Sequence, residues 1–221
     1  MRNRLAARVA AGTVAALAAL LVLSGCGGGS QEGPVSDVSV HDSDGINGVV
    51  LPQAYRSPDV DLRDTGGASY DLATDAKKPL TLVFFGYTNC PDVCQLVMAN
   101  LASALVRLDP SHRKQVGVVF VTTDPRRDTS SVLRSYLDRF NPAFEGLTGP
   151  LPAIVRAGKA FDIPIEKGHK LASGGYDVAH GTQVVGLKPD GTAPYVWTQG
   201  TTPGQLADDL TAILDDKVPA T

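Results

Sequence analysis

Residues 84–101 read FFGYTNCPDVCQLVMANL, and this stretch decides the fold. Its first four residues complete a run over residues 79–87 that is almost entirely apolar and has the length of a strand. Such a run is expected of a strand covered on both faces. The sequence from Pro91 onward has helical periodicity, with the proline placed for a first helical turn. We therefore predict a buried strand that delivers two cysteines, Cys90 and Cys94, to the start of a helix.

Strands and helices alternate through the rest of this domain. Two turns are marked by glycine, one within a short hairpin at residues 59–73 and one at Pro189-Asp190-Gly191. The helix over 129–140 has Asp128 or Thr129 available as its cap. The other predicted elements are a buried strand at 115–124, a helix at 150–163, a strand pair over 182–200 and an amphipathic helix at 202–216. This order predicts an α/β fold with a mixed sheet and helices on both faces.

The first 25 residues have the pattern of an export signal. Three arginines precede an apolar run over residues 9–23 and then small residues. The run is short for a spanning helix, which needs about 20 residues. Leu23 to Cys26 reads LSGC and resembles a bacterial lipobox, so we expect lipidation of Cys26, with an uncleaved membrane anchor as the alternative.

Residues 26–50 begin rich in glycine, serine and aspartate, which predicts a flexible, lipidated tether. His41 lies in this tether and is expected to be solvated. One folded domain is predicted over residues 51–217. Either origin of the N-terminus places that domain outside the cytoplasm, and lipidation would hold it at the extracytoplasmic face of a bacterial cell membrane.

The charge of the chain argues against nucleic acid as a partner. Without residues 1–25, 17 basic and 23 acidic residues remain, a formal net charge of −6. Binding to phosphates needs a basic face, so we predict no nucleic-acid partner.

The chain has three cysteines, and if lipid takes Cys26 a single pair remains. A crosslink between Cys90 and Cys94 would close a very small loop and stabilise the fold little, so we expect a functional pair. Thiols at a helix N-terminus have a lowered pKa and suit disulfide exchange. However, redox centres of the thioredoxin type use C-x-x-C, whereas C-x-x-x-C leaves the sulfurs freer to act as paired ligands for copper(I), zinc or an iron–sulfur centre.

A metal site would need a third ligand. His112 and His169 lie in polar loops, where we expect His112 to face solvent and His169 to take no part in ligation. His180 ends the second of these loops, directly before the strand pair. A loop leading into a central strand can face the helix N-terminus that carries the cysteines. These considerations alone leave His180 open as a ligand.

Three motifs in order carry a resemblance to a known family. They are GYTNCPDVC at 86–94, VTTDPRRDT at 121–129 and YDVAHGTQVVGLKPDG at 176–191. From about residue 55 onward the chain resembles the Sco/SenC family of copper-binding assembly proteins. The resemblance implies a thioredoxin-like fold, to which the predicted N-terminal hairpin is an addition.

The resemblance also implies a membrane-tethered protein that loads copper into the dinuclear copper site of cytochrome c oxidase. Cys90, Cys94 and His180 match the family's copper ligands. Two thiolates suit copper(I), and a neutral imidazole also tolerates copper(II). The expected partners are the copper-receiving oxidase subunit, another copper donor protein, and the membrane through the lipid anchor.

Some residues around these ligands differ from the family pattern, and others have more than one expected role. Asn89 and Gln95 stand where members often have an aromatic residue or histidine and a proline. Asp92 has the plain role of stabilising the helix N-terminus, and could also tune the thiols or guide a partner. Asp124 has the plain role of a turn residue, or could support a ligand from behind.

The leading interpretation is a metal-binding assembly factor and not a turnover enzyme. The alternative is a thiol–disulfide oxidoreductase that keeps cysteines of the oxidase or another exported cuproprotein reduced. His180 separates the two, because a reductase can lose it and a copper carrier cannot. A thiol peroxidase is disfavoured because Thr88 lies too close to Cys90, and a structural lipoprotein would not explain the ordered Cys/Cys/His motifs.

Overall fold

The computed structural model describes residues 45–91, 93–170 and 176–218, and only the backbone for 167–170 and 176–180. The strands are β1 (Val49–Arg56), β2 (Leu62–Asp64), β3 (Ser69–Tyr70), β4 (Leu80–Gly86), β5 (Val116–Thr122), β6 (Glu145–Thr148), β7 (Ile165–Lys170), β8 (Tyr176–His180), β9 (Val184–Leu187) and β10 (Thr192–Trp197). The helices are α1 (Val93–Arg107), α2 (Pro110–Gln115), α3 (Ser130–Leu137), α4 (Leu151–Ala160) and α5 (Pro203–Leu214).

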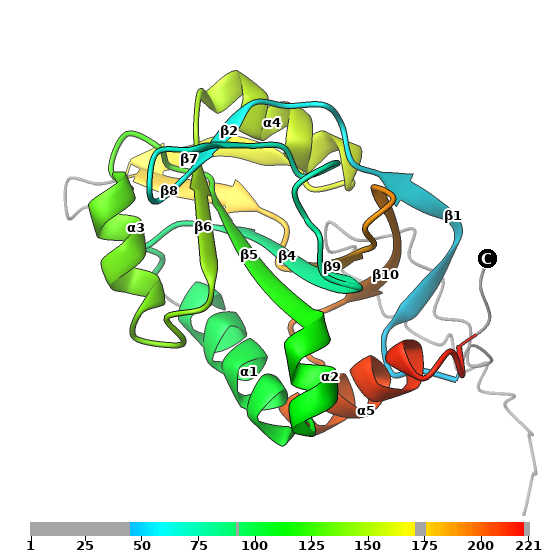
Figure 1. Cartoon of the computed structure of the whole chain (residues 1–221). Helices are drawn as coiled ribbons and strands as arrows, with labels where there is room; N and C mark the ends of the chain where they lie inside the picture. Colours follow the sequence, from blue (N-terminus) through cyan, green and yellow to red (C-terminus); the bar gives the residue numbers. More distant parts are fainter. Residues whose placement is uncertain (1–44, 92, 171–175, 219–221) are drawn as a thin grey trace, which may run out of the picture. The chain divides into compact units, whose positions relative to one another are not determined.

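Eight of these strands form one mixed sheet, in the order β1-β10-β9-β4-β5-β6-β2-β3 (Figure 1). β5 runs parallel to β4 and to β6, because a helix returns the chain between each pair. β9 runs antiparallel to β4, and β10 to β9. The predicted α/β class with a mixed sheet is therefore confirmed. So is the N-terminal hairpin, since β2 pairs antiparallel with β3 across Gly66 and Gly67.

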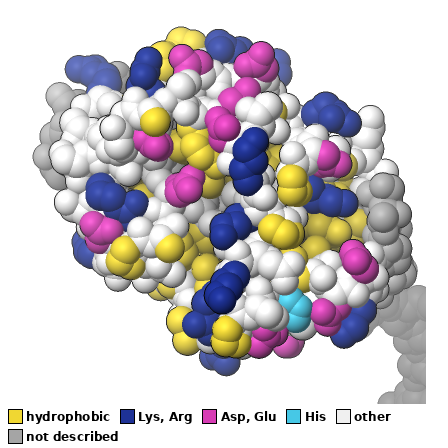
Figure 2. Space-filling view, in the orientation of Figure 1, with side chains coloured by type: hydrophobic (Ala, Val, Ile, Leu, Met, Phe, Trp, Pro, Cys, Tyr) yellow, Lys and Arg dark blue, Asp and Glu magenta, His cyan; other side chains and the backbone are white. Residues whose placement is uncertain are grey.

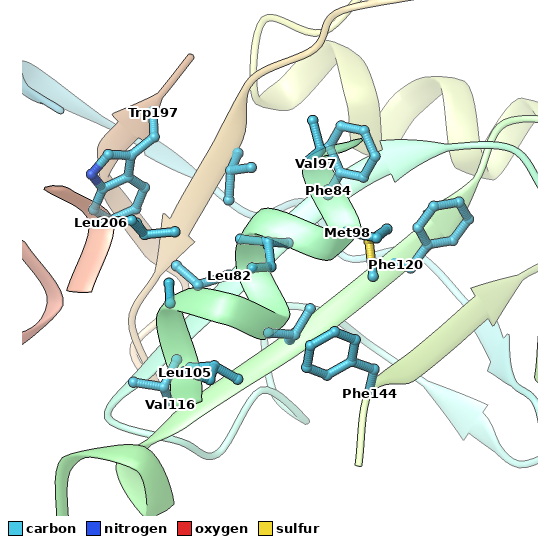
Figure 3. Packing of buried hydrophobic residues seen from close by; sticks show 14 of the residues in the cluster. Leu82, Phe84, Val97, Met98, Leu105, Val116, Phe120, Phe144, Trp197 and Leu206 are labelled. Atoms are coloured by element: carbon cyan, nitrogen blue, oxygen red, sulfur yellow. The ribbon is translucent and has the colours of Figure 1, made fainter. Parts of the chain in front are cut away.

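Side chains of the central strands alternate between two hydrophobic layers. Leu82 and Phe84 of β4 pack on one face, while Val83 and Phe85 pack on the other. Figure 3 shows the first layer, where Phe120 of β5 and residues of α1 such as Met98 meet. The first layer is covered by α1, α3 and α5 and the second by α4, as Figure 1 also shows, so the prediction of helices on both faces is confirmed.

The folded part begins before residue 51. β1 starts at Val49 and pairs with β10. The backbone N–H groups of Asn47 and Gly48 donate to the Asp209 carboxylate at 2.8 and 2.9 Å. The end of the segment predicted as tether therefore belongs to the fold. The predicted signal sequence at 1–25, Cys26 and His41 lie outside the described residues.

The prediction that His112 lies in a solvent-facing polar loop is wrong. Asp109 accepts hydrogen bonds from the N–H groups of Ser111 and His112 and so caps the short helix α2, which starts at Pro110. The His112 side chain is only 15% exposed, because it lies between Asp109 and Asp215.

The segment predicted as the His169 and His180 loop also contains regular structure. β7 and β8 pair antiparallel in a second, two-stranded sheet, with Ile165 opposite His180. The sequence did not predict these strands because lysine and glycine interrupt the alternation expected of a strand. Both histidine side chains lie outside what the structure describes.

Acidic and basic side chains alternate over the face seen in Figure 2, with apolar areas between them. This face therefore offers no single basic field for a phosphate backbone. In the described part of the chain, none of the helices has the length and apolar content to cross a membrane.

Candidate metal and thiol site

The cysteine pair lies where β4 ends and α1 begins. The Cys90 N–H donates to the Tyr87 carbonyl oxygen at 3.2 Å, which closes a tight turn after the strand. In the first turn of α1, the Cys94 N–H donates to the Cys90 sulfur at 3.4 Å. Cys90 is 5% exposed and Cys94 is fully buried. Two soft sulfur donors are thus brought together at a helix N-terminus, where the helix dipole favours a negatively charged group.

For Cys94 the prediction of a lowered thiol pKa is wrong. Hydrogen bonding to Cys90 and burial raise the pKa of the Cys94 thiol well above its ordinary value. The helix dipole is outweighed, because losing water penalises the charged form of a fully buried group. A soft metal ion that binds such a sulfur must displace its proton.

Asp128 fastens the cysteine loop to the sheet. Its carboxylate is fully buried and accepts hydrogen bonds from the Thr88 N–H at 2.9 Å and the Thr88 hydroxyl at 2.6 Å. It also accepts one from the Thr122 hydroxyl at 2.6 Å. Thr88 lies two residues before Cys90, so this carboxylate joins the end of β5 to the loop that positions the first sulfur.

Asp128 is not the cap of α3. That role belongs to Thr129, whose hydroxyl accepts from the Val132 N–H. Sequence reasoning offered Asp128 only as an alternative cap, because its partner Thr88 is distant along the chain. The motif VTTDPRRDT could have indicated a further role for Asp128. Thr129 alone can cap the helix and Asp124 already occupies the turn, so neither role needs a second acidic residue.

Asp124 supports the same region from another side. Its side chain is buried and forms an ion pair with Arg127. The Arg127 guanidinium lies 5.8 Å from the ring centroid of Tyr87, the first residue after β4. Asp124 is therefore more than a turn residue, and Arg127 is partly buried, with its side chain 28% exposed. The other arginine of the motif, Arg126, is exposed.

The His180 side chain and Asp92 lie outside the described residues, so only backbone register bears on the histidine. Val184, at the start of β9, pairs with Phe84 near the end of β4. The segment that follows His180 thus reaches the sheet at the end where the cysteine loop begins. Among the side chains that the structure describes, no three His, Cys, Asp or Glu residues converge as a metal site.

A groove of ≈ 630 Å³ opens beside the cysteine loop. Asn89 and Gln95, the two departures from the family pattern, line it together with Tyr136 and Arg139. Tyr136 is 2% exposed, and burial together with the nearby Cys94 and Cys90 raises the pKa of its hydroxyl. The sequence placed Tyr136 only within a predicted helix over 129–140, and nothing in that pattern indicated a position beside the thiols.

The absence of a side chain at Gly86 leaves room for the Cys94 sulfur. A Cβ at this position would lie 3.0 Å from the Cys94 sulfur and 3.0 Å from the Phe120 ring. We expect Gly86→Ala to lower the free energy of unfolding by about 1–3 kcal/mol, because overpacking forces buried neighbours to shift. Urea unfolding measures this, with Gly204→Ala as the control, since a Cβ at Gly204 meets nothing within 4 Å. Equal stability of the two variants would contradict the proposed crowding.

A cysteine pair at the strand-to-helix junction of a mixed α/β sheet defines a thioredoxin-like dithiol protein. The model of the SCO1/SenC family matches residues 58–215, and the chain belongs to this family.

Similar proteins of known sequence support this membership. A protein of Stutzerimonas stutzeri that is provisionally named as copper-binding is 31% identical over 149 residues, covering 67% of this chain and 72% of that protein. An SCO2-like protein of Rickettsia felis is 40% identical over 91 residues, 41% of this chain. The match spans 43% of the Rickettsia protein, less than half of its length.

Two solved structures confirm the thioredoxin-like fold predicted from the resemblance. Copper-bound ScoI of Bradyrhizobium japonicum superposes with a TM-score of 0.63 at 28% identity, over 71% of this chain and 98% of that one. Apo Sco1 of Thermus thermophilus superposes with a TM-score of 0.67 at 26% identity, over 78% of this chain and 99% of that one.

Proposed function

We propose that this chain binds one copper ion through Cys90, Cys94 and His180 and delivers it to the dinuclear copper site of cytochrome c oxidase. The observation that carries the proposal is the pair of buried sulfurs at the start of α1, in a fold shared with a copper-bound relative. Thiolates are the ligands that hold copper(I). Since Cys90 and Cys94 are both buried, the sulfur side of a bound ion would be shielded from water.

The third ligand and the delivery step are the finer parts of the proposal. A site of two sulfurs and one imidazole leaves the ion open to attack by a partner's ligands, as a transfer protein requires. The register of β9 against β4, which brings the segment after His180 to the cysteine end of the sheet, supports its place in the ligand set. We infer that the receiving partner is an oxidase subunit and that another copper protein supplies the ion.

The location of the protein is part of the same proposal. Lipidation at Cys26 would anchor the chain to the extracytoplasmic face of a bacterial membrane, and residues 27–44 would let the domain reach a membrane-bound oxidase.

A thiol–disulfide oxidoreductase is the second candidate. The hydrogen bond from the Cys94 N–H to the Cys90 sulfur favours it, because it places the two sulfur-bearing residues against each other at a helix N-terminus. Copper and disulfide chemistry would use the same two sulfurs, so His180 is the residue that distinguishes them.

Anaerobic titration of the reduced chain with copper(I) tests the proposal. We expect the unsubstituted chain to bind one ion. Cys90→Ser, Cys94→Ser or His180→Ala should each weaken binding by at least about 100-fold, because the loss of a ligand costs more than the loss of a residue that only supports a ligand. His112→Ala is the matched control and should bind as the unsubstituted chain does, because His112 pairs with Asp109 and Asp215 instead. Weak copper binding, together with rapid disulfide exchange whose rate is the same in His180→Ala, would support the oxidoreductase.

A further inference from the structure

Tyr136 carries a buried hydroxyl that nothing in the described part of the chain satisfies. Its side chain is 2% exposed, and the oxygen finds no hydrogen-bond partner among the described residues. Leaving a buried polar group unpaired costs about 1–3 kcal/mol, so such a group in a native protein calls for an explanation.

The ring of Tyr136 is held firmly in place. It packs against Phe120 at 5.5 Å and Phe140 at 5.2 Å between ring centroids. Arg139 covers it, with the guanidinium 4.9 Å from the ring centroid. Contacts with all three groups leave the ring little rotational freedom, so the direction of its hydroxyl is fixed in advance.

The neighbours of the ring place it beside the cysteines. Phe120 and the Cys94 sulfur both lie 3.0 Å from the position of a Cβ on Gly86, so this sulfur is adjacent to the ring against which Tyr136 packs. Tyr136 also shares the wall of the groove with Asn89 and Gln95, which flank the two cysteines in sequence. The electrostatic influence of both cysteines on the Tyr136 hydroxyl agrees with this placement.

We propose that the Tyr136 hydroxyl is a positioning group that donates a hydrogen bond to a cysteine sulfur when that sulfur binds copper as a thiolate. The inference rests on the proposed copper function. A thiol is a weak acceptor, whereas a thiolate is charged and accepts a strong hydrogen bond. The hydroxyl has no hydrogen-bond partner among the described residues of the metal-free protein and would gain one in the loaded protein, so it stabilises only the loaded state. Hydrogen bonds to a cysteine sulfur also tune copper–thiolate centres.

Tyr136→Phe tests this inference, because it removes the hydroxyl and keeps the ring. The metal-free variant should unfold at the same or a higher urea concentration than the unsubstituted chain, since a buried unpaired group is lost. Copper(I) should nevertheless bind about tenfold more weakly, the value of one hydrogen bond to a charged group. The sulfur-to-copper(II) charge-transfer absorption should also shift. A merely structural tyrosine would change stability and leave this absorption alone.

Tyr195→Phe is the matched control. Tyr195 is also buried in the first hydrophobic layer, but it lies on β10, two strands away from β4. Its substitution should leave copper binding and absorption unchanged. Identical copper affinity and absorption in Tyr136→Phe and the unsubstituted chain would overturn the inference and leave the proposed function standing. Failure of the unsubstituted chain to bind copper would overturn both.

Discussion

Replacing Asp128 with alanine is expected to cost about 3 kcal/mol of unfolding free energy, because it leaves buried donors without their acceptor. The donors are the Thr88 N–H, the Thr88 hydroxyl and the Thr122 hydroxyl. Copper binding should also weaken. Without this carboxylate the cysteine loop is no longer joined to the end of β5, so Cys90 loses its fixed position and copper(I) binding should weaken by at least about tenfold.

Asp128→Asn is the control that separates geometry from charge. The Oδ2 atom accepts from the Thr88 N–H and the Thr122 hydroxyl, whereas Oδ1 accepts only from the Thr88 hydroxyl. An asparagine can keep its carbonyl oxygen at the first position and direct its amide toward the Thr88 hydroxyl, which can accept as well as donate. We therefore expect Asp128→Asn to retain most of the stability and copper binding.

Urea unfolding of the metal-free protein and copper(I) competition titrations measure the two effects. If the Asp128→Ala variant is less stable but binds copper(I) with unchanged affinity, the carboxylate contributes to folding alone. Equal losses in Asp128→Asn and Asp128→Ala would show that its charge matters more than its hydrogen bonds.

The sequence predicted the elements whose pattern is local. β4 is buried along its whole length and α1 follows with a regular apolar stripe, so both stand out from single segments. The C-x-x-x-C pair is also local, because Cys90 and Cys94 lie on one strand-to-helix connection. Short or polar elements did not stand out. β6 has four residues, and α2 is a six-residue polar helix that begins at Pro110 and is capped by Asp109.

The surroundings of the cysteines could not be predicted for a different reason. Thr88 and Asp128 are 40 residues apart, and their hydrogen bonds exist only because β4 and β5 end side by side. Tyr136 reaches the site by packing on Phe120, a contact between a helix and a strand. The residue type and the local pattern indicate whether such a residue is polar or buried. Which residues it contacts depends on the tertiary structure.

Asp209→Asn is expected to be far more damaging than Asp128→Asn, although both replace a fully or almost fully buried carboxylate by an amide. Asp209 is 2% exposed. Its Oδ1 atom accepts from the Asn47 N–H at 2.8 Å and the Asn47 side-chain amide at 2.7 Å. Its Oδ2 atom accepts from the Gly48 N–H at 2.9 Å and from the Trp197 indole N–H at 2.8 Å. All four donors are N–H groups. The Asn47 side-chain amide can flip to present its carbonyl oxygen, but the two backbone N–H groups and the indole N–H can only donate, and at least one of these faces each carboxylate oxygen.

An asparagine at this position must direct its amide at N–H groups whichever way it turns. We therefore expect Asp209→Asn to lower the unfolding free energy by about 3 kcal/mol, through donors left unsatisfied in the interior. The effect should be confined to folding, because these contacts join α5 to the segment before β1 and to β10, two strands from β4. Below the unfolding transition, Asp209→Asn should still bind one copper ion with unchanged affinity. A stability equal to that of the unsubstituted chain would contradict the hydrogen-bond assignment, and weakened copper binding in the folded variant would contradict the separation of this carboxylate from the site.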